Sequence, residues 1–120
     1  MKKIVIGGQI DKEEVKQLVE AYGENRYDIS IKNDLDAAMA VKTGAADYYI
    51  GACNTGGGGA LAMALALLGR QECVTISMPG HVMSDEEIIE NVKSGKKAFG
   101  FTAQHKEIVI PIIMKALNEQ

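Results

Sequence analysis

The sequence predicts an α/β protein, a three-layer α-β-α sandwich built on a mainly parallel, Rossmann-like sheet of five strands. Two observations predict this fold. Short apolar or alternating segments recur five times along the chain, and segments with apolar residues at helical spacing separate them. Strands that alternate with helices form βαβ units, whose right-handed crossovers place helices on both faces of a parallel sheet.

Composition supports one such domain over residues 1–120 and excludes several classes of protein. The chain is 47% hydrophobic and 24% charged, which is too apolar for a disordered protein. Its net charge of -3, without a basic cluster, argues against nucleic-acid binding. No apolar stretch approaches the roughly 18 residues that span a membrane, so we expect a soluble, cytoplasmic protein.

The first strand is expected at residues 3–6, a short apolar run that ends at two glycines. This basic and then apolar N-terminus resembles a signal peptide, but its apolar run is too short and acidic residues follow at once. Asp11 then fits the N-cap of a helix, with Glu14 as its capping-box partner. Residues 27–31 alternate in polarity and predict the second strand.

The second helix is expected to start at Asn33 or Asp34 and to end at Gly44. Residues 48–52 predict the third strand, which runs into a glycine-rich loop. A helix that starts at about Ala60 and ends at Leu68 follows this loop.

The fourth strand is expected at residues 73–77, and a loop that contains His81 follows it. Ser84 and Glu87 then form a second capping box at the start of the next helix. Residues 98–101 predict the short fifth strand.

Thr102 or Gln104 is expected to open the last helix. Pro111 lies well inside its apolar pattern. Either this proline kinks the helix, or the helix starts later than this placement.

The glycine-rich loop is the most informative segment for function. It consists of Cys53, Asn54 and Thr55 followed by four glycines: Gly56, Gly57, Gly58 and Gly59. The backbone amides of such a loop, next to the start of a helix, form a concave nest that favours an anion such as phosphate. The loop matches neither the Walker pattern nor the dinucleotide-binding pattern. The glycines could also serve only close packing between helix and strand.

Ligands of such sheets bind beyond the carboxyl ends of the strands, so we expect Gly8 and Gln9 to lie beside this nest. Asn54 and Thr55 could contact the same ligand or cap the helix.

Two residues are candidates for chemistry. Cys53 stands directly before the nest and could act as a base or nucleophile, because a helix N-terminus favours a thiolate; it could equally be a small buried residue. His81 is a weaker candidate for proton transfer, and a solvated loop histidine is the simpler interpretation. We interpret Cys73 as structural and His105 as a first-turn residue of the last helix.

The cysteines and histidines are too few and too scattered for a disulfide framework or a zinc site, so we expect no metal and no cofactor. The stretch from Ala60 to Leu68 is apolar on every side of a helix and therefore predicts burial all round. In a small chain this favours a homo-oligomer, most simply a dimer, whose interface lies close to the site. A central helix covered by its own domain is the alternative.

Over nearly its whole length the sequence resembles a small bacterial family of unknown function, the YhfU-like proteins. The opening residues 2–8 and the stretch from Asp47 to Gly59 carry this resemblance. It implies no particular activity.

Residues 47–58 are also similar to the Cys-Gly-Thr-Gly-x-Gly loop of the ribose-5-phosphate isomerase B and galactose-6-phosphate isomerase group. That resemblance implies that Cys53 is the base that moves a proton between adjacent carbons. Thr55, Gly56, Gly57 and Gly58 would then hold the oxyanion.

The sequence departs from the isomerase group in several places. Asn54 replaces the loop glycine, and Gly8-Gln9-Ile10-Asp11 stands where the group has an Asp-His pair. The group's His-Asn pair and its C-terminal arginines have no counterpart either.

Three hypotheses follow from the sequence. The chain could be an enzyme that acts on a small sugar phosphate or sugar acid, with Cys53 in the nest. It could be a module that binds a phosphorylated metabolite without chemistry. It could also be an accessory subunit whose apolar helix contacts a partner protein.

Overall fold

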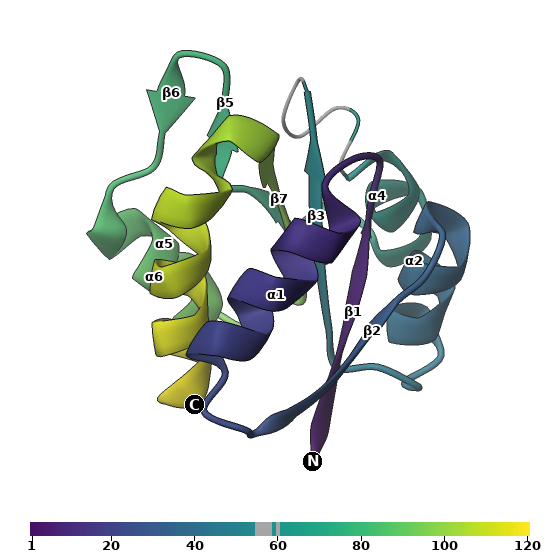
Figure 1. Ribbon diagram of the computed structural model, residues 1–120. Coiled ribbons are helices and arrows are strands. Elements are labelled where there is room, and N and C mark those ends of the chain that lie inside the picture. The colour runs from purple at the N-terminus through teal and green to yellow at the C-terminus, as the bar shows by residue number, and fades with distance from the viewer. Residues whose placement is uncertain (55–58, 60) are drawn as a thin grey trace.

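The computed structural model confirms the predicted three-layer α/β sandwich around a five-stranded parallel sheet (Figure 1). It describes residues 1–54, 59 and 61–120. The strands follow the spatial order β2-β1-β3-β7-β4. Their bounds are β1 (Lys2–Gly8), β2 (Tyr27–Ile31), β3 (Tyr48–Cys53), β4 (Cys73–Thr75) and β7 (Ala98–Thr102). The chain leaves β1 toward one edge of the sheet and β3 toward the other, which makes the gap between them a topological switch point.

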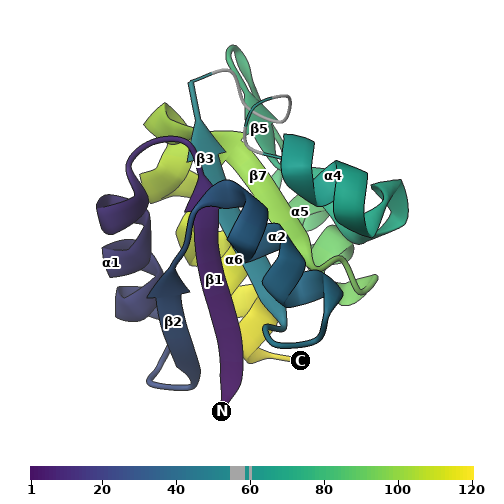
Figure 2. The same ribbon diagram turned by 90° about the vertical axis from the view of Figure 1, so that its right-hand side faces the viewer.

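Helices cover both faces of the sheet. On one face lie α1 (Lys12–Tyr22), α5 (Asp85–Lys93) and α6 (Lys106–Asn118), and on the other lie α2 (Asp34–Lys42) and α4 (Ala62–Leu68) (Figure 2). Two separate apolar clusters form the core. The larger one packs β-strand side chains such as Ile50 and Phe99 against α1, α5 and α6, and the smaller one centres on Tyr49 beneath α2 and α4.

The two predicted capping boxes have different outcomes. Ser84 and Glu87 form the expected capping box at the start of α5. The capping box expected for Asp11 and Glu14 is wrong: Asp11 is the N-cap residue of α1 but has a left-handed backbone (φ 56°) and makes no side-chain cap. Its carboxylate instead accepts a hydrogen bond from Lys106 Nζ at 3.3 Å, so a tertiary contact replaces the local one.

The second helix begins as expected, because the Asn33 side chain accepts from the backbone N–H of Asp36. The last helix starts later than expected. A 3-10 turn, η2 (Ala103–His105), precedes α6, which begins at Lys106 and still contains Pro111.

The fourth strand is shorter than predicted. β4 ends at Thr75, and the chain then forms a separate antiparallel hairpin of β5 (Ser77–Met78) and β6 (His81–Val82). A short 3-10 turn, η1 (Arg70–Glu72), precedes β4. Ser77 leaves the sheet because its side-chain hydroxyl, in place of a backbone carbonyl, accepts from the Thr102 N–H at 3.1 Å.

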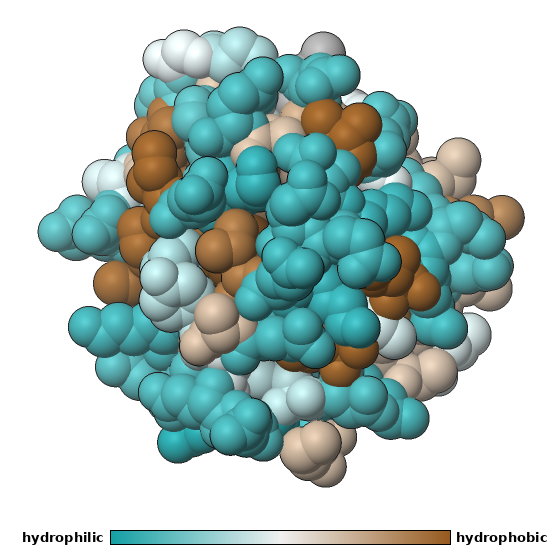
Figure 3. All heavy atoms as spheres, viewed as in Figure 1, coloured by the Kyte–Doolittle hydropathy of each residue, from teal (hydrophilic) through white to brown (hydrophobic). Residues whose placement is uncertain are grey.

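The alternative that the apolar fourth helix is a central helix covered by its own domain is wrong, and its coverage by a second subunit stays a prediction. In α4 only Ala64 is buried, whereas Met63 is 42% exposed and Leu65 is 38% exposed. Residue 60 lies outside the described residues, so its place as the helix start is not compared. The face over α1 and α6 is different: hydrophilic side chains dominate it and its hydrophobic areas are small and separate (Figure 3).

Gly7 in β1 gives a test of the packing around Tyr49. A Cβ on Gly7 would lie 2.4 Å from Cε2 of the buried Tyr49 ring. We expect Gly7→Ala to lower the free energy of unfolding by about 1–3 kcal/mol, as overpacked core positions do. Urea unfolding measures this change.

Gly44 supplies the control for that experiment. Its φ is +83° and a Cβ there would meet nothing within 4 Å, so Gly44→Ala adds backbone strain without a clash. We expect it to cost about 1 kcal/mol. A smaller cost for Gly7→Ala than for Gly44→Ala would contradict the clash with the Tyr49 ring.

Candidate functional site

The turn after β1 directs Gln9 over the end of β3. Gly8 has φ +80°, and a Cβ at this position would lie 2.6 Å from both the nitrogen and the oxygen of Ala52. Only glycine combines this conformation with such a close approach. The next residue, Gln9, donates its backbone N–H to the Ala52 carbonyl at 2.9 Å. The turn is therefore fixed against β3, where Cys53 follows.

Gly59 lies against the same place. A Cβ built on Gly59 would lie 3.1 Å from Cys53 Sγ and 3.1 Å from Gln9 Oε1. The chain therefore returns, after the glycine-rich loop, to within contact of the ends of β1 and β3. This is the switch point of the sheet, where open α/β sheets place their ligands. Gly8, Gln9, Cys53 and Gly59 were all predicted site residues, and the structure brings these four together.

Hydrogen bonds among Gly8, Asp34 and Tyr49 connect the turn after β1 to β3 and α2. The N–H of Gly8 donates to the Tyr49 hydroxyl at 3.0 Å and to Asp34 Oδ1 at 3.2 Å, and the Tyr49 O–H donates to the same carboxylate oxygen. Burial, with the Asp34 carboxylate beside it, raises the pKa of Tyr49 far above its ordinary value of 10.0. Tyr49 therefore stays a neutral donor, and the first turn of α2 is tied to the end of β1.

Thr102 adds an unsatisfied polar group next to Cys53. The two residues are direct partners in the β3–β7 register, so their side chains leave the same face of the sheet. Thr102 is 2% exposed, and its Oγ1 has no hydrogen-bond partner. Because a buried hydroxyl without a partner costs about 1–3 kcal/mol, such a group calls for an explanation.

The acidic side chains at this end of the sheet already have donors. Asp34 accepts from Tyr49 and Gly8, and Asp11 is paired with Lys106 at 3.3 Å, with both side chains at most one third exposed. Lys12, a basic side chain at the same end, does not pair with these carboxylates but donates to the Lys32 carbonyl at 2.9 Å. The carboxylates are thus partly compensated and oppose a bound anion less than free ones would.

Of the remaining predicted residues, the structure describes only Asn54 and His81, and both are exposed. Asn54 follows β3 and is exposed. Thr55, Gly56, Gly57 and Gly58 lie outside the described residues. His81 is exposed in the β5–β6 hairpin, which lies to the left of the end of β3 in Figure 1, and it pairs with Met78 in that hairpin.

Three residues at this edge were missed from the sequence: Thr102, Ser77 and His105. The buried Ser77 hydroxyl accepts from the Thr102 N–H and lies 2.9 Å from His105 Nδ1. One signal was available, since Thr102 follows a predicted strand and so belongs to the carboxyl edge. The Ser77–His105 contact joins residues 28 positions apart and has no local signal.

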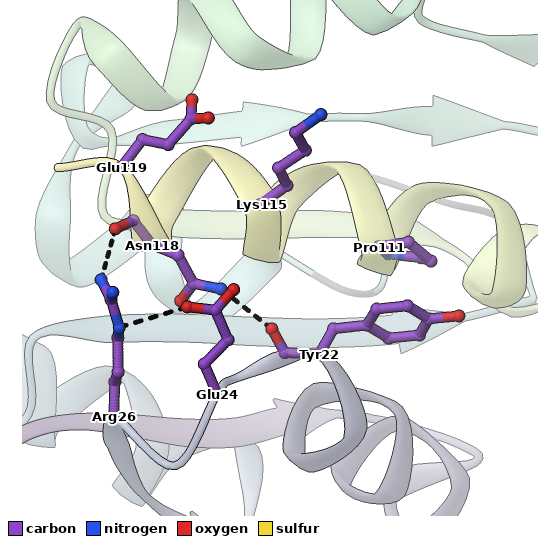
Figure 4. Close-up of a pocket in the computed structure, with 7 residues that line it drawn as sticks. All are labelled: Tyr22, Glu24, Arg26, Pro111, Lys115, Asn118 and Glu119. Atoms are coloured by element: carbon purple, nitrogen blue, oxygen red, sulfur yellow. Dashed lines mark hydrogen bonds and ion pairs between the residues drawn. The ribbon is translucent and has the colours of Figure 1, made fainter.

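A surface cavity lies at the other end of the molecule. It measures about 490 Å³ between the C-terminal ends of α1 and α6, and its lining includes Tyr22 and Pro111 (Figure 4). Arg26, its most basic group, already donates to the Asn118 carbonyl at 2.6 Å and pairs with Glu24 at 3.3 Å. Lys115 is the second basic residue of the lining, which also contains Glu24 and Glu119, so the charges of the cavity balance.

The described residues contain neither a group of side chains suited to a metal ion nor a helix suited to a membrane. Within residues 1–54, 59 and 61–120, no three His, Cys, Asp or Glu side chains are grouped so that they could hold a metal ion. In the same part of the chain, no helix has the length and apolar character needed to cross a membrane.

Comparison with known proteins places the chain in a family. Residues 2–117 match the model of a family described as protein of unknown function DUF2620. The chain belongs to this family. The uncharacterized protein YhfU of Escherichia coli strain K12 is 44% identical over 118 residues, which are 98% of this chain and 100% of that protein. The YhfU proteins of Escherichia coli O6:H1 and Shigella flexneri give the same values.

The comparisons confirm the resemblance to the YhfU-like proteins and leave the activity of the DUF2620 family open. They do not support the resemblance to the ribose-5-phosphate isomerase B group. No solved structure gives a significant match to the chain.

The Tyr49 hydroxyl gives a test of the corner between β1, β3 and α2. Tyr49→Phe removes the donor to Asp34 and leaves a partly buried carboxylate oxygen with one partner fewer. We expect a loss of about 1–3 kcal/mol in the free energy of unfolding, measured in urea. Tyr48→Phe is the matched control, because its hydroxyl accepts only a 3.4 Å bond from exposed Lys2. Equal effects of the two substitutions would contradict the structural role of the Tyr49 hydroxyl.

The raised pKa of Tyr49 predicts a loss of stability at alkaline pH. In the unfolded chain this phenol loses its proton near its ordinary pKa of 10.0, whereas the folded protein keeps the proton. The unfolded state then binds fewer protons, so the free energy of unfolding falls as pH rises above about 10. Burial also raises the pKa of Cys73, which contributes to the same slope. Unfolding followed against pH should show a shallower alkaline decline in Tyr49→Phe, and an unchanged slope would refute this assignment.

Proposed function

We propose that this protein binds a small anionic metabolite, phosphorylated or carboxylated, at the carboxyl edge of its sheet between β1 and β3. The observation that carries the proposal is the position of Gly59 at the topological switch point, where an added Cβ would lie 3.1 Å from both Cys53 Sγ and Gln9 Oε1. Glycine at this position leaves the space that a Cβ would fill.

The polar groups around this point suit an oxyanion. Gln9 contributes a side-chain amide, and the buried Thr102 hydroxyl lacks a partner that a ligand oxygen would supply. Both are neutral donors, which bind an anion without adding a charge that must be desolvated. Asn54 and Thr55 to Gly58 enter the proposal through their sequence, because consecutive glycine amides favour an anion.

Cys53 decides between the catalytic and the non-catalytic form of the proposal. Its side chain is 1% exposed and lies beside Gln9 and Gly59. In the catalytic form, its thiolate removes a proton from the carbon next to a carbonyl of a bound sugar phosphate, as in an isomerase. In the alternative form, the protein is a binding module or an accessory subunit, and Cys53 is a packed side chain.

The apolar surface of α4 also extends the proposal to a dimer. Met63 and Leu65 on α4 lie next to α2, where Leu35 and Met39 are exposed as well. No charged residue occurs between Asp47 and Arg70, so α4 contributes only uncharged side chains to this surface, although α2 also carries Asp36 and Lys42. A second copy of the chain supplies a matching apolar surface. We expect a dimer by analytical ultracentrifugation that Leu65→Glu converts to monomer. A wild-type chain that is monomeric at all accessible concentrations would contradict this interface.

Ligand binding is tested by thermal unfolding with inorganic phosphate, ribose 5-phosphate and simple sugar acids. A ligand at 100 times its dissociation constant adds about 2.7 kcal/mol of stability, which is a readily measured shift. We expect Gln9→Ala and Thr102→Val to weaken binding about tenfold each, or about 1.4 kcal/mol. Gln17→Ala on the exposed face of α1 and Thr43→Val at the end of α2 are the matched controls. No shift with any ligand would refute the anion site.

The role of Cys53 is tested by comparing Cys53→Ser with Cys73→Ser. Cys73 is also buried but lies at the opposite end of the sheet, in the first position of β4. If Cys53 is the base, Cys53→Ser abolishes the exchange of a carbon-bound substrate proton with solvent, followed by NMR, and keeps ligand binding. Exchange that survives in Cys53→Ser, or is absent from the wild type, would leave only the binding module.

A further inference from the structure

Ser77 and His105 form a hydrogen-bonded pair at the same end of the sheet. The Ser77 Oγ lies 2.9 Å from His105 Nδ1 and accepts the backbone N–H of Thr102 at 3.1 Å. Ser77 is 1% exposed, so water does not compete for its hydroxyl. The pair joins the ends of β4 and β7 to the residue that caps α6.

The partners of the Ser77 hydroxyl fix the tautomer of His105. The Thr102 N–H donates into the hydroxyl oxygen, which leaves the single hydroxyl proton for donation. The oxygen has a second lone pair, so this bond alone does not assign the proton. Ser77 is 1% exposed, however, and among the described residues its hydroxyl has no acceptor other than His105 Nδ1 at 2.9 Å, so we infer that Nδ1 is the acceptor. A neutral imidazole that accepts at Nδ1 carries its proton on Nε2. The hydrogen bond from Ser77 thus leaves Nε2 as the nitrogen through which His105 donates.

The position of this donor links it to the proposed site. The backbone N–H of Thr102 donates to the Ser77 hydroxyl, and Thr102 is the register partner of Cys53. His105 is half-buried and is linked to Thr102 by two hydrogen bonds through Ser77. The neighbouring Lys106 is occupied by Asp11 at 3.3 Å. A second polar group at this edge, the Thr102 Oγ1, is buried and has no partner.

We propose that His105 is the histidine of the anion site, and that its Nε2–H donates to an oxyanion bound at the carboxyl edge. Ser77 is the positioning residue that keeps the Nδ1 nitrogen unprotonated. This inference rests on the proposed function and deepens it, because it adds a donor that is set by the fold. It also replaces His81, which is exposed on the hairpin, as the histidine to test.

The tautomer is tested by NMR of the imidazole nitrogens at a pH where His105 is neutral. The chain has two histidines, so His81→Gln leaves the signals of His105 alone. We expect an unprotonated Nδ1 and a protonated Nε2, and a loss of this preference in Ser77→Ala. Protonation at Nδ1, or a tautomer that Ser77→Ala leaves unchanged, overturns the positioning role. Circular dichroism and urea unfolding show whether Ser77→Ala still folds, and Ser77→Thr, which keeps the hydroxyl, should retain the tautomer.

The donor role is tested by titration with inorganic phosphate. The amide of glutamine can replace Nε2 of histidine, whereas the amide of asparagine replaces Nδ1. We therefore expect His105→Asn to weaken phosphate binding about tenfold and His105→Gln to weaken it less than about threefold. His81→Gln is the control and should bind as the wild type does.

The outcomes separate this inference from the proposed function. Phosphate binding that His105→Asn leaves unchanged overturns the role of His105 while the anion site stands. A wild-type chain that does not bind phosphate, ribose 5-phosphate or sugar acids overturns both. Equal losses in His105→Asn and His105→Gln indicate that the ring only packs, and they overturn the donor role.

Discussion

The close packing of Tyr49 against β1 is the constraint on which the rest of the structure depends. Its buried ring occupies the space that Cβ atoms on Gly7 and Gly51 would fill, so two neighbouring strands accept it only because both carry glycine there. Its hydroxyl then ties Asp34 in α2 to the N–H of Gly8. One side chain thereby fixes the second helix, the two central strands and the turn that carries Gln9. A change at any of these positions would move the candidate site as well as the core.

The candidate site is built from chain segments that end at one edge of the sheet. Gln9 follows β1, Cys53 ends β3 and Thr102 ends β7, while Gly59 returns to the first two. The parallel sheet supplies this convergence because the carboxyl ends of all its strands point the same way. The Asp11–Lys106 pair links the turn after β1 to the start of α6 on the same edge. The DUF2620 family has no described activity, so the chemistry of these side chains is the best guide to function.

Particular residues show how far the sequence predicted the fold and the site. The order of strands and helices followed from apolar spacing, and the capping box of Ser84 was correct because both partners lie within one turn. The capping box of Asp11 failed because Lys106, distant in sequence, takes its carboxylate. β4 ended early because Ser77 uses its side chain as the acceptor for β7. The exposure of Met63 and Leu65 contradicts full burial of α4 within the single chain. In each failure a contact between distant segments, or its absence, decided the outcome.

The sequence by itself determined the α/β sandwich, the positions of the strands and the placement of Gly8, Gln9 and Cys53 at the carboxyl edge. These features depend on hydrophobic periodicity and on strand polarity, which are local properties of the chain. The tertiary structure alone decided that Gly59 lies near Cys53 and Gln9, that the Thr102 hydroxyl has no partner and that Ser77 is hydrogen-bonded to His105. Such contacts join residues far apart in sequence. Their geometry is set by how the core packs, and no local pattern encodes it.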